Sequence, residues 1–106
     1  MTAICLAPVD FREARMAFDI RHDLAARRFE TRVDGFECVL DYVERAGVMT
    51  ITHTGVPSAA GGRGIAAALV QAALDTARAN GWRVVPACSY AAAWIRRHPG
   101  YQDMLA

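Results

Sequence analysis

The chain has 106 residues, of which 54% are hydrophobic and 22% are charged, and its formal net charge at pH 7 is +1. This composition excludes a globally disordered chain, and the length suffices for one compact domain but not for two. All 12 cationic side chains are arginine, because the sequence contains no lysine. The missing lysine excludes Schiff-base chemistry and a Walker-type phosphate loop, so a phosphate site must use arginine or backbone N–H groups.

The two halves of the chain differ in charge. Residues 1–50 carry nine acidic side chains and seven arginines, whereas residues 51–106 carry two acidic side chains and five arginines. An excess of positive charge attracts anions, so we expect an anion to bind the second half. Chance variation on a solvated surface is the alternative explanation of this asymmetry.

Residues 1–27 have the weakest pattern and form an N-terminal extension within one expected domain that spans residues 1–106. Apolar residues at helical spacing over 11–18 predict a short amphipathic helix. The apolar run at the start ends at Pro8 and Asp10, which is too early for a secretory signal or a membrane span. The sequence therefore predicts neither export nor a membrane partner.

Cysteine and histidine usage indicates a reducing compartment and no metal site. The cysteines Cys5, Cys38 and Cys88 show no Cys-x-x-Cys spacing, and the three histidines lie far apart. Zinc ligands usually occur at short regular spacings, and an odd number of cysteines without a signal segment is typical of free thiols. We therefore expect a cytoplasmic protein that needs no metal.

The segment from residue 29 to residue 54 predicts an antiparallel β-meander. Residues 29–34 alternate with period two, Asp34-Gly35 then favours a two-residue type I′ turn, and a second strand follows over 36–43. A second turn at 45–47 leads into a third strand over 48–54. Strict alternation in that strand would place the following residues on one face: Val48, Thr50, Thr52 and Thr54.

The second half of the chain predicts a strand-loop-helix-strand crossover. A glycine-rich loop over 55–64 precedes an apolar helical stripe that ends at Asn80-Gly81, a left-handed C-cap. Three polar residues of this helix are expected to face water: Gln71, Asp75 and Arg78. The helix is followed by a short buried strand over 83–88 that is parallel to the strand before the loop.

The last part of the chain predicts an edge strand and a C-terminal helix. Pro86 cannot donate a ladder hydrogen bond, so the strand over 83–88 lies at an edge or has a break in its pairing. Residues 90–97 predict a last helix that is stopped by Pro99-Gly100. The expected fold class is α/β (α+β), with a meander, a β-loop-α-β crossover and a C-terminal helix.

Three glycines at a strand-to-helix junction carry the first functional signal. Gly61, Gly62 and Gly64 allow close backbone approach, and the first-turn N–H groups of the helix have no partners within it. Such a helix start binds anions, although packing of a tight turn explains the glycines equally well. The Rossmann pattern Gly-x-Gly-x-x-Gly is excluded because position 67 is alanine.

Four ordered segments together resemble a known family. Residues 52–57, 62–66, 84–88 and 95–101 are similar to the small, single-domain branch of the GNAT N-acetyltransferase superfamily. The resemblance covers roughly residues 27–104. It implies a GNAT-like fold and an acyltransferase that moves an acetyl group from acetyl-CoA to an amine.

The resemblance also assigns cofactor-binding positions. The glycine-rich loop would hold the pyrophosphate of acetyl-CoA, and the main chain at Val56 would meet the pantetheine arm. Since coenzyme A is a polyanion, this accounts for the positive second half. The loop positions are Gly61, Gly62, Arg63, Gly64, Ile65 and Ala66.

Two positions depart from the pattern of that branch. Gly61 stands where arginine or glutamine is usual, which removes one side-chain contact but leaves the amide groups. Trp94 stands where close relatives often carry tyrosine, so a phenol that could protonate the leaving thiolate is absent there. Tyr90 is the nearest hydroxyl that could replace it.

Two residues are the candidate catalytic groups. The resemblance implies that Cys88 is a catalytic thiol, and the start of the following helix would lower its pKa; a small buried hydrophobic side chain is the alternative. His53 is the candidate base, or else a hydrogen-bonded structural residue. His98 is a weaker base candidate and is better explained as a helix-terminal cap.

The sequence and the family resemblance also indicate which binding partners to expect. We expect the acceptor to be a small-molecule or protein amine. The alternative to an enzyme is a module that binds or senses coenzyme A and has little catalytic activity. Arg96 and Arg97 either contact the 3′-phosphate of the cofactor or form a solvated helix end. Nucleic acid is not an expected partner, because the arginines are dispersed and the pI is about 7.8. The apolar meander could pair with a second copy, which would give a homodimer.

Overall fold

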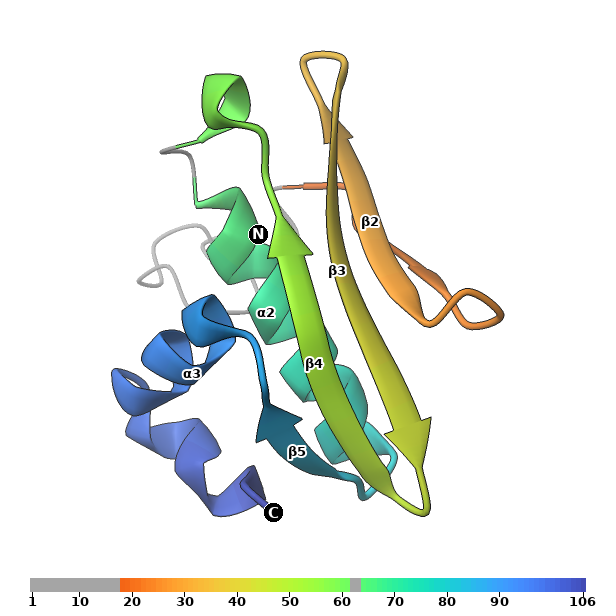
Figure 1. Cartoon of the computed structure of the whole chain (residues 1–106), viewed down its shortest axis with the longest axis vertical. Coiled ribbons are helices and arrows are strands. Elements are labelled where there is room, and N and C mark those ends of the chain that lie inside the picture. The colour runs from red at the N-terminus through yellow and green to blue at the C-terminus, as the bar shows by residue number, and fades with distance from the viewer. Residues whose placement is uncertain (1–17, 62–63) are drawn as a thin grey trace, which may run out of the picture.

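The structure is a computed structural model that describes residues 18–61 and 64–106. Its centre is a five-stranded sheet in the order β1-β2-β3-β4-β5 (Figure 1). The helix expected over 11–18 falls almost entirely outside the described residues. The strands are β1 (Arg21–Asp23), β2 (Arg28–Val33), β3 (Phe36–Arg45), β4 (Val48–Gly55) and β5 (Arg83–Pro86); the helices are α2 (Ile65–Ala79) and α3 (Ser89–Arg96), with the 3₁₀ turns η2 (Ser58–Ala60) and η3 (Pro99–Met104).

The expected antiparallel meander is confirmed, and its turns have the predicted chemistry. Both residues of the first turn have positive φ, 52° at Asp34 and 82° at Gly35. The second turn repeats this geometry, with φ of 55° at Ala46 and 82° at Gly47. Positive φ at both central positions defines the type I′ turn, whose twist matches that of the flanking strands.

The strand β1 adds a short edge that the sequence pattern did not predict. It has only three residues and pairs antiparallel with β2. The His22 ring stacks on Phe29 with 4.1 Å between ring centroids, and its Nε2 lies 2.6 Å from the Tyr42 hydroxyl. Side-chain contacts to the neighbouring strands, rather than strand propensity, hold this segment against the sheet.

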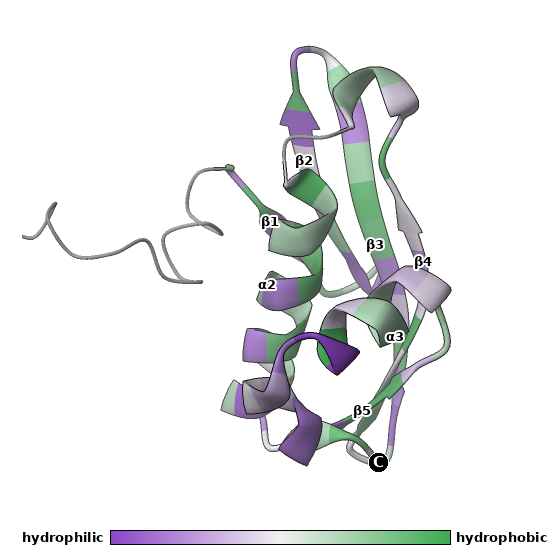
Figure 2. Ribbon diagram, turned by 90° about the vertical axis from the view of Figure 1, so that its left-hand side faces the viewer, coloured by the Kyte–Doolittle hydropathy of each residue, from purple (hydrophilic) through white to green (hydrophobic). Residues whose placement is uncertain are grey.

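The helix α2 covers one face of the sheet and supplies most of the core. Figure 2 shows α2 and the strands as two layers, with hydrophobic residues on the helix and along the middle of β3. Leu69 and Leu74 on the helix and Leu40 and Ile51 on the strands are completely buried. The face of β3 and β4 opposite α2 is toward the viewer in Figure 1 and is covered by no helix among the described residues.

The expectation that Gln71 faces water is wrong. Gln71 is 3% exposed, and its Nε2 donates to the Tyr101 hydroxyl at 3.4 Å. The same hydroxyl donates to the carboxylate of Asp75 at 2.9 Å. The turn η3 folds over this side of α2, and helix periodicity alone cannot show which tertiary neighbour covers a polar position.

The crossover is parallel, as predicted, but β5 is shorter and less buried than expected. It pairs with β4 from Val48 and Arg83 to Ile51 and Pro86 and lies at the sheet edge, which accounts for the proline. Val84 is fully buried, whereas Val85 is 38% exposed. Residues 87 and 88 have left the strand, because the chain turns there toward α3.

The last helix ends before Pro99-Gly100, as predicted, because α3 stops at Arg96 with Arg97 as its C-cap. Pro99 and Gly100 begin η3, consistent with the preference of proline for the first turn of a helix. Beyond η3, Leu105 forms a single parallel bridge with Val84. No helix within the described residues is both long and apolar enough to cross a membrane.

Candidate active site

The site is built where β4 and β5 separate. The two strands are paired only as far as Ile51 and Pro86, and the Cys88 N–H makes a last hydrogen bond to the Ile51 carbonyl at 3.0 Å. Beyond this point β4 continues to Gly55, paired with β3 alone. Figure 1 shows β5 turning toward α3 while β4 runs on. Within residues 18–61 and 64–106, the β5-facing edge of this last part of β4 therefore has no strand beside it.

A bulge in β4 lies beside this opening. On β3, Asp41 pairs with His53 of β4. The next residue, Tyr42, pairs with Ile51, so Thr52 is an extra residue in β4. An extra residue reverses the alternation of side chains beyond it.

The reversal corrects the predicted face of Thr54. Thr54 pairs with the buried Leu40, and directly paired residues share a face of the sheet. Thr54 therefore points toward α2, whereas strict alternation had placed it with Val48 on the opposite face. His53 pairs with Asp41, so it lies on the face away from α2.

Cys88 stands at the base of the opening. It is the N-cap residue of α3, half-buried, with its Sγ donating to the Thr54 Oγ1 at 3.6 Å. The predicted position at the end of the strand is thus shifted to the helix start, where unpaired N–H groups and the helix dipole favour negative charge.

The surroundings of the Cys88 sulfur lower its pKa. Desolvation by burial is the largest single influence and acts to raise the pKa, but it is outweighed by hydrogen bonds from the backbone N–H groups of Ala91, Tyr90 and Thr54 and from the Thr54 hydroxyl. A lowered pKa increases the fraction of nucleophilic thiolate at neutral pH.

The start of α2 forms the second part of the site. Gly64 is its N-cap residue with φ of 78°, a left-handed conformation that favours glycine. No side chain caps the helix, and its first turn contains no acidic residue that would repel an anion. Ile65 is buried and therefore offers its backbone rather than its side chain, while Gly62 and Arg63 lie outside the described residues.

A groove of about 320 Å³ runs between α2 and α3. Gly64, Ala67, Ala68 and Gln71 line it on the α2 side. Its α3 side is lined by Tyr90, Trp94, Arg97 and His98. The groove joins the uncapped start of α2 to the helix that carries Cys88, and it contains one of the two arginines predicted to meet a phosphate.

Among the described residues that line this groove, Tyr90 is the one with a hydroxyl side chain. It is 40% exposed. Burial raises the pKa of its phenol, against the opposite effect of Arg97, so the phenol is protonated at neutral pH. Tyr90 can therefore donate a proton, whereas Trp94 offers no hydroxyl.

His53 is exposed on the sheet face opposite α2. Its imidazole lies over Gly55, where an added Cβ would come within 2.8 Å of the His53 Nε2. Val56 follows directly and packs against the core. His53 and Cys88 thus flank the opening from opposite faces of the sheet.

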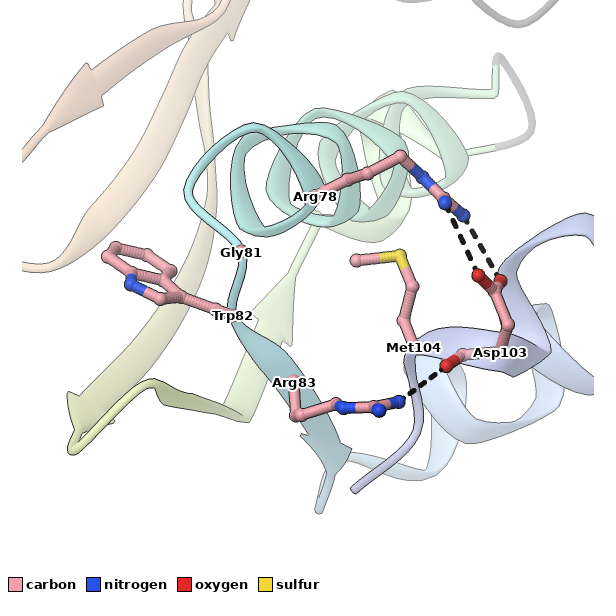
Figure 3. Close-up of a pocket in the computed structure, with 6 residues that line it drawn as sticks. All are labelled: Arg78, Gly81, Trp82, Arg83, Asp103 and Met104. Carbon is pink, nitrogen blue, oxygen red and sulfur yellow. Dashed lines mark hydrogen bonds and ion pairs between the residues drawn. The ribbon is translucent and has the colours of Figure 1, made fainter.

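A second cavity, of about 310 Å³, lies at the other end of α2 (Figure 3). Arg78 and Arg83 point into it, but both guanidinium groups bind Asp103. Arg78 contacts the carboxylate at 3.2 Å and 3.4 Å, and Arg83 donates to the backbone oxygen at 2.7 Å. These interactions close η3 onto α2 and β5, so the cavity is part of the structural framework. In the part of the chain that the structure describes, no cluster of three or more potential metal ligands occurs.

Comparison with known proteins identifies the family. A family model described as GCN5-related N-acetyl-transferase matches residues 28–104. The chain belongs to this N-acetyltransferase family. The match begins at β2 and ends at the last residue of η3, so it includes both the opening between β4 and β5 and the groove between α2 and α3.

Individual relatives agree with the family match. The chain is similar to protein NATD1 of Gallus gallus, with 30% identity over 97 residues, 88% of this chain and 87% of the relative. NATD1 of Bos taurus is 32% identical over 84 residues, 76% of this chain and 74% of the relative. A GCN5-like protein from Staphylococcus aureus, solved by NMR, has a TM-score of 0.67 and 25% identity over 84% of this chain and 88% of that protein.

The residues of this family member are compatible with acetyl-CoA, the cosubstrate of the family. The uncapped α2 start, free of acidic residues, suits a pyrophosphate. The unpaired edge of β4 suits an amide-bearing arm that bonds to main chain. Arg97 adds a positive charge to the groove between α2 and α3.

Sequence reasoning missed two residues of this site. Gln71 was expected in water, and Thr54 was expected on the wrong face. The first error arises from a distant turn, η3, and the second from one extra residue in β4. Neither feature has a marker in the local sequence pattern, although the run of threonines at 50, 52 and 54 showed that hydroxyl groups were available near the loop.

Proposed function

We propose that this chain transfers an acetyl group from acetyl-CoA to an amine of a small molecule or a protein, and that Cys88 carries the acetyl group between them. The observation that carries the proposal is the position of the Cys88 thiol, at the N-terminus of α3 and at the base of the opening between β4 and β5. A thiol in this environment is a nucleophile, and the family supplies the thioester substrate.

Backbone groups would hold the cofactor. The pyrophosphate would bind the sequence segment from Gly61 to Ala66, which includes the first residues of α2, and the pantetheine arm would lie along β4 as far as the main chain of Val56. Arg97 would face a phosphate from the opposite side of the groove. When bound, acetyl-CoA supplies an acetyl group already activated as a thioester.

In the first step, the Cys88 thiolate forms a bond to the acetyl carbonyl carbon while the bond from that carbon to the sulfur of coenzyme A breaks. Tyr90 would protonate the departing thiolate, since its phenol is protonated and lies on the first turn of α3. Backbone N–H groups along the unpaired edge of β4 would stabilise the oxyanion.

In the second step, the acceptor amine attacks the acetyl-Cys88 thioester, the amide bond forms, and Cys88 leaves as a thiolate. The proton lost by the amine passes to His53, which is exposed on the sheet face opposite α2. The acceptor would therefore approach from that uncovered face, while the cofactor occupies the face with α2.

A module that binds coenzyme A without transferring acetyl groups is the second candidate. Trp94 favours it, since this side chain is 5% exposed, stacks on His98 and provides no acid. The two candidates share the binding groove and differ only in turnover.

The test combines calorimetry with mass spectrometry. The protein is titrated with acetyl-CoA, incubated with it, and then mixed with a panel of amines, while free coenzyme A is measured by chromatography. We expect binding, acetylation of Cys88, and loss of that acetyl group when an acceptor is added. Because the chain has no lysine, no lysine amine of its own competes for the acetyl group.

Two variants complete this test. Cys88→Ala is expected to bind acetyl-CoA and to lose acetylation and turnover, whereas Cys38→Ala, which removes a thiol buried in the core, should retain both. No binding by any protein would overturn the whole proposal. Turnover retained by Cys88→Ala would indicate direct attack by the amine, and binding without turnover would favour the module.

A further inference from the structure

Thr54 and Cys88 meet across the opening between β4 and β5. Their side chains are 3.6 Å apart, from Sγ to Oγ1, although the residues are 34 positions apart in sequence. The backbone contact from the Cys88 N–H to the Ile51 carbonyl, at 3.0 Å, fixes the position of the cysteine relative to β4. Pairing of β4 with β3 fixes the backbone of Thr54, so the Thr54 hydroxyl is held beside the sulfur.

The bulge in β4 determines which side chain takes this place. With uninterrupted alternation after Ile51, residue 53 would face α2 and residue 54 would face away. The extra residue, Thr52, reverses this order, so Thr54 faces the sulfur and His53 faces the open side of the sheet. A hydroxyl, not an imidazole, is thus the β4 side chain next to Cys88.

Charged groups do not replace this hydroxyl. Among the described residues, the groups that favour the Cys88 thiolate are the Thr54 hydroxyl, the Thr54 backbone N–H and the backbone N–H groups at the start of α3, and none of them is charged. The titratable or charged side chains on the adjoining elements are His53 on the opposite face of β4, Arg83 at the start of β5, and Tyr90, Arg96 and Arg97 along α3.

We propose that Thr54 is a positioning residue for Cys88: its hydroxyl donates a hydrogen bond to the thiolate and holds the sulfur at the opening between β4 and β5. The importance of Thr54 in catalysis rests on the proposed function, in which Cys88 carries the acetyl group. The effect of Thr54 on the thiol can be measured without any cofactor.

The experiment measures how fast iodoacetamide alkylates Cys88 as a function of pH, with the Cys88 peptide quantified by mass spectrometry. Thr54→Val keeps the shape of the side chain and removes the donor. We expect its alkylation midpoint to rise by about one pH unit, so that about tenfold less thiolate is present at a fixed pH below both midpoints. Thr54→Ser restores the hydroxyl and should return the midpoint toward that of the unaltered protein.

Thr52→Val is the matched control. Thr52 is the adjacent β-branched hydroxyl, but its Oγ1 donates to the Asp41 carbonyl at 3.2 Å, so its loss should leave the midpoint unchanged. Thermal unfolding verifies that each variant is folded, and Thr54→Ala replaces Thr54→Val if the valine variant does not fold. An unchanged midpoint in a folded variant without the hydroxyl overturns the inference.

Acetyl transfer is measured on the same proteins, so the two proposals can fail separately. A raised midpoint without acetylation of Cys88 in the unaltered protein would support the role of Thr54 toward the thiol and reject the proposed function. Normal acetylation with an unchanged midpoint in Thr54→Val would keep the function and reject the role of Thr54.

Discussion

The indole of Trp94 stacks on the imidazole of His98 with 3.8 Å between ring centroids and an interplanar angle of 12°. The His98 Nδ1 also lies 2.7 Å from the Trp94 carbonyl oxygen. The His98 side chain thus contacts both the backbone at the C-terminal end of α3 and Trp94 in the wall of the groove between α2 and α3. This geometry agrees with the explanation of His98 as a helix-terminal cap.

His98→Ala is therefore expected to lower the free energy of unfolding by about 1 kcal/mol, the usual contribution of one hydrogen bond. The rate of acetyl transfer should fall only as far as the fraction of folded protein falls or the groove between α2 and α3 changes shape. His98→Phe keeps a ring against Trp94 and separates stacking from hydrogen bonding. Abolished transfer in a fully stable His98→Ala protein would instead assign the histidine to catalysis.

Gly64→Ala tests the anion site at the α2 start. Alanine at φ of 78° is strained, so we expect a loss of about 1 kcal/mol in stability together with weaker binding of acetyl-CoA in calorimetry. Gly35→Ala is the control, because Gly35 has φ of 82° in the first hairpin and likewise has no atom within 4 Å of an added Cβ. Equal losses of affinity in both variants would contradict a local role for Gly64.

Tyr90→Phe removes the proposed acid while keeping the ring. If Tyr90 protonates coenzyme A as it leaves, the rate of acetylation of Cys88 should fall by about a hundredfold. Alkylation of Cys88 by iodoacetamide should be unchanged, because the Tyr90 backbone N–H near the sulfur remains. Rapid-quench measurement of acetyl-Cys88 checks this, and an unaltered rate would assign the proton to solvent.

The Arg78–Asp103 ion pair gives a pH-dependent contribution to stability. The hydrogen bond from Arg78 lowers the pKa of the Asp103 carboxyl below its usual 3.8. A carboxyl with a lowered pKa binds its proton less readily in the folded state, so its stabilisation is complete above pH 4 and is lost as the pH falls through the folded pKa.

Asp103→Asn should thus lower the melting temperature slightly near neutral pH, and the difference from the unaltered protein should vanish in acid. Both side chains are largely exposed, so high salt should also reduce the difference. Thermal unfolding followed by circular dichroism at several pH values measures it. A difference that grows in acid would have the wrong sign.

Much of the fold could be predicted from local chemistry. Asp34-Gly35 and Gly47 specify tight hairpins, and Asn80-Gly81 ends α2 where expected, with Gly81 at φ of 72°. These residues act through their own backbone preferences, so their effects can be read from a few neighbouring positions. The parallel crossover follows from the order of the elements alone.

The rest depended on contacts between distant residues. Gln71 is buried because Tyr101 reaches it from η3, and β1 is held by stacking of His22 on Phe29. The direction of Thr54 depends on where β4 gains its extra residue, which pairing with β3 decides. The candidate site was predicted as a set of residues, but the relation of Cys88 to Thr54 required the fold.

The separation of β4 from β5 has a consequence for binding kinetics. The parallel pairing ends at Ile51 and Pro86, so in the described part of the chain an incoming arm has no hydrogen bond of the β4–β5 ladder to break. A ligand that enters a preformed opening loses little affinity to rearrangement of the protein. Association should therefore be a single phase whose rate rises linearly with ligand concentration, without the plateau that a slow strand-opening step would impose.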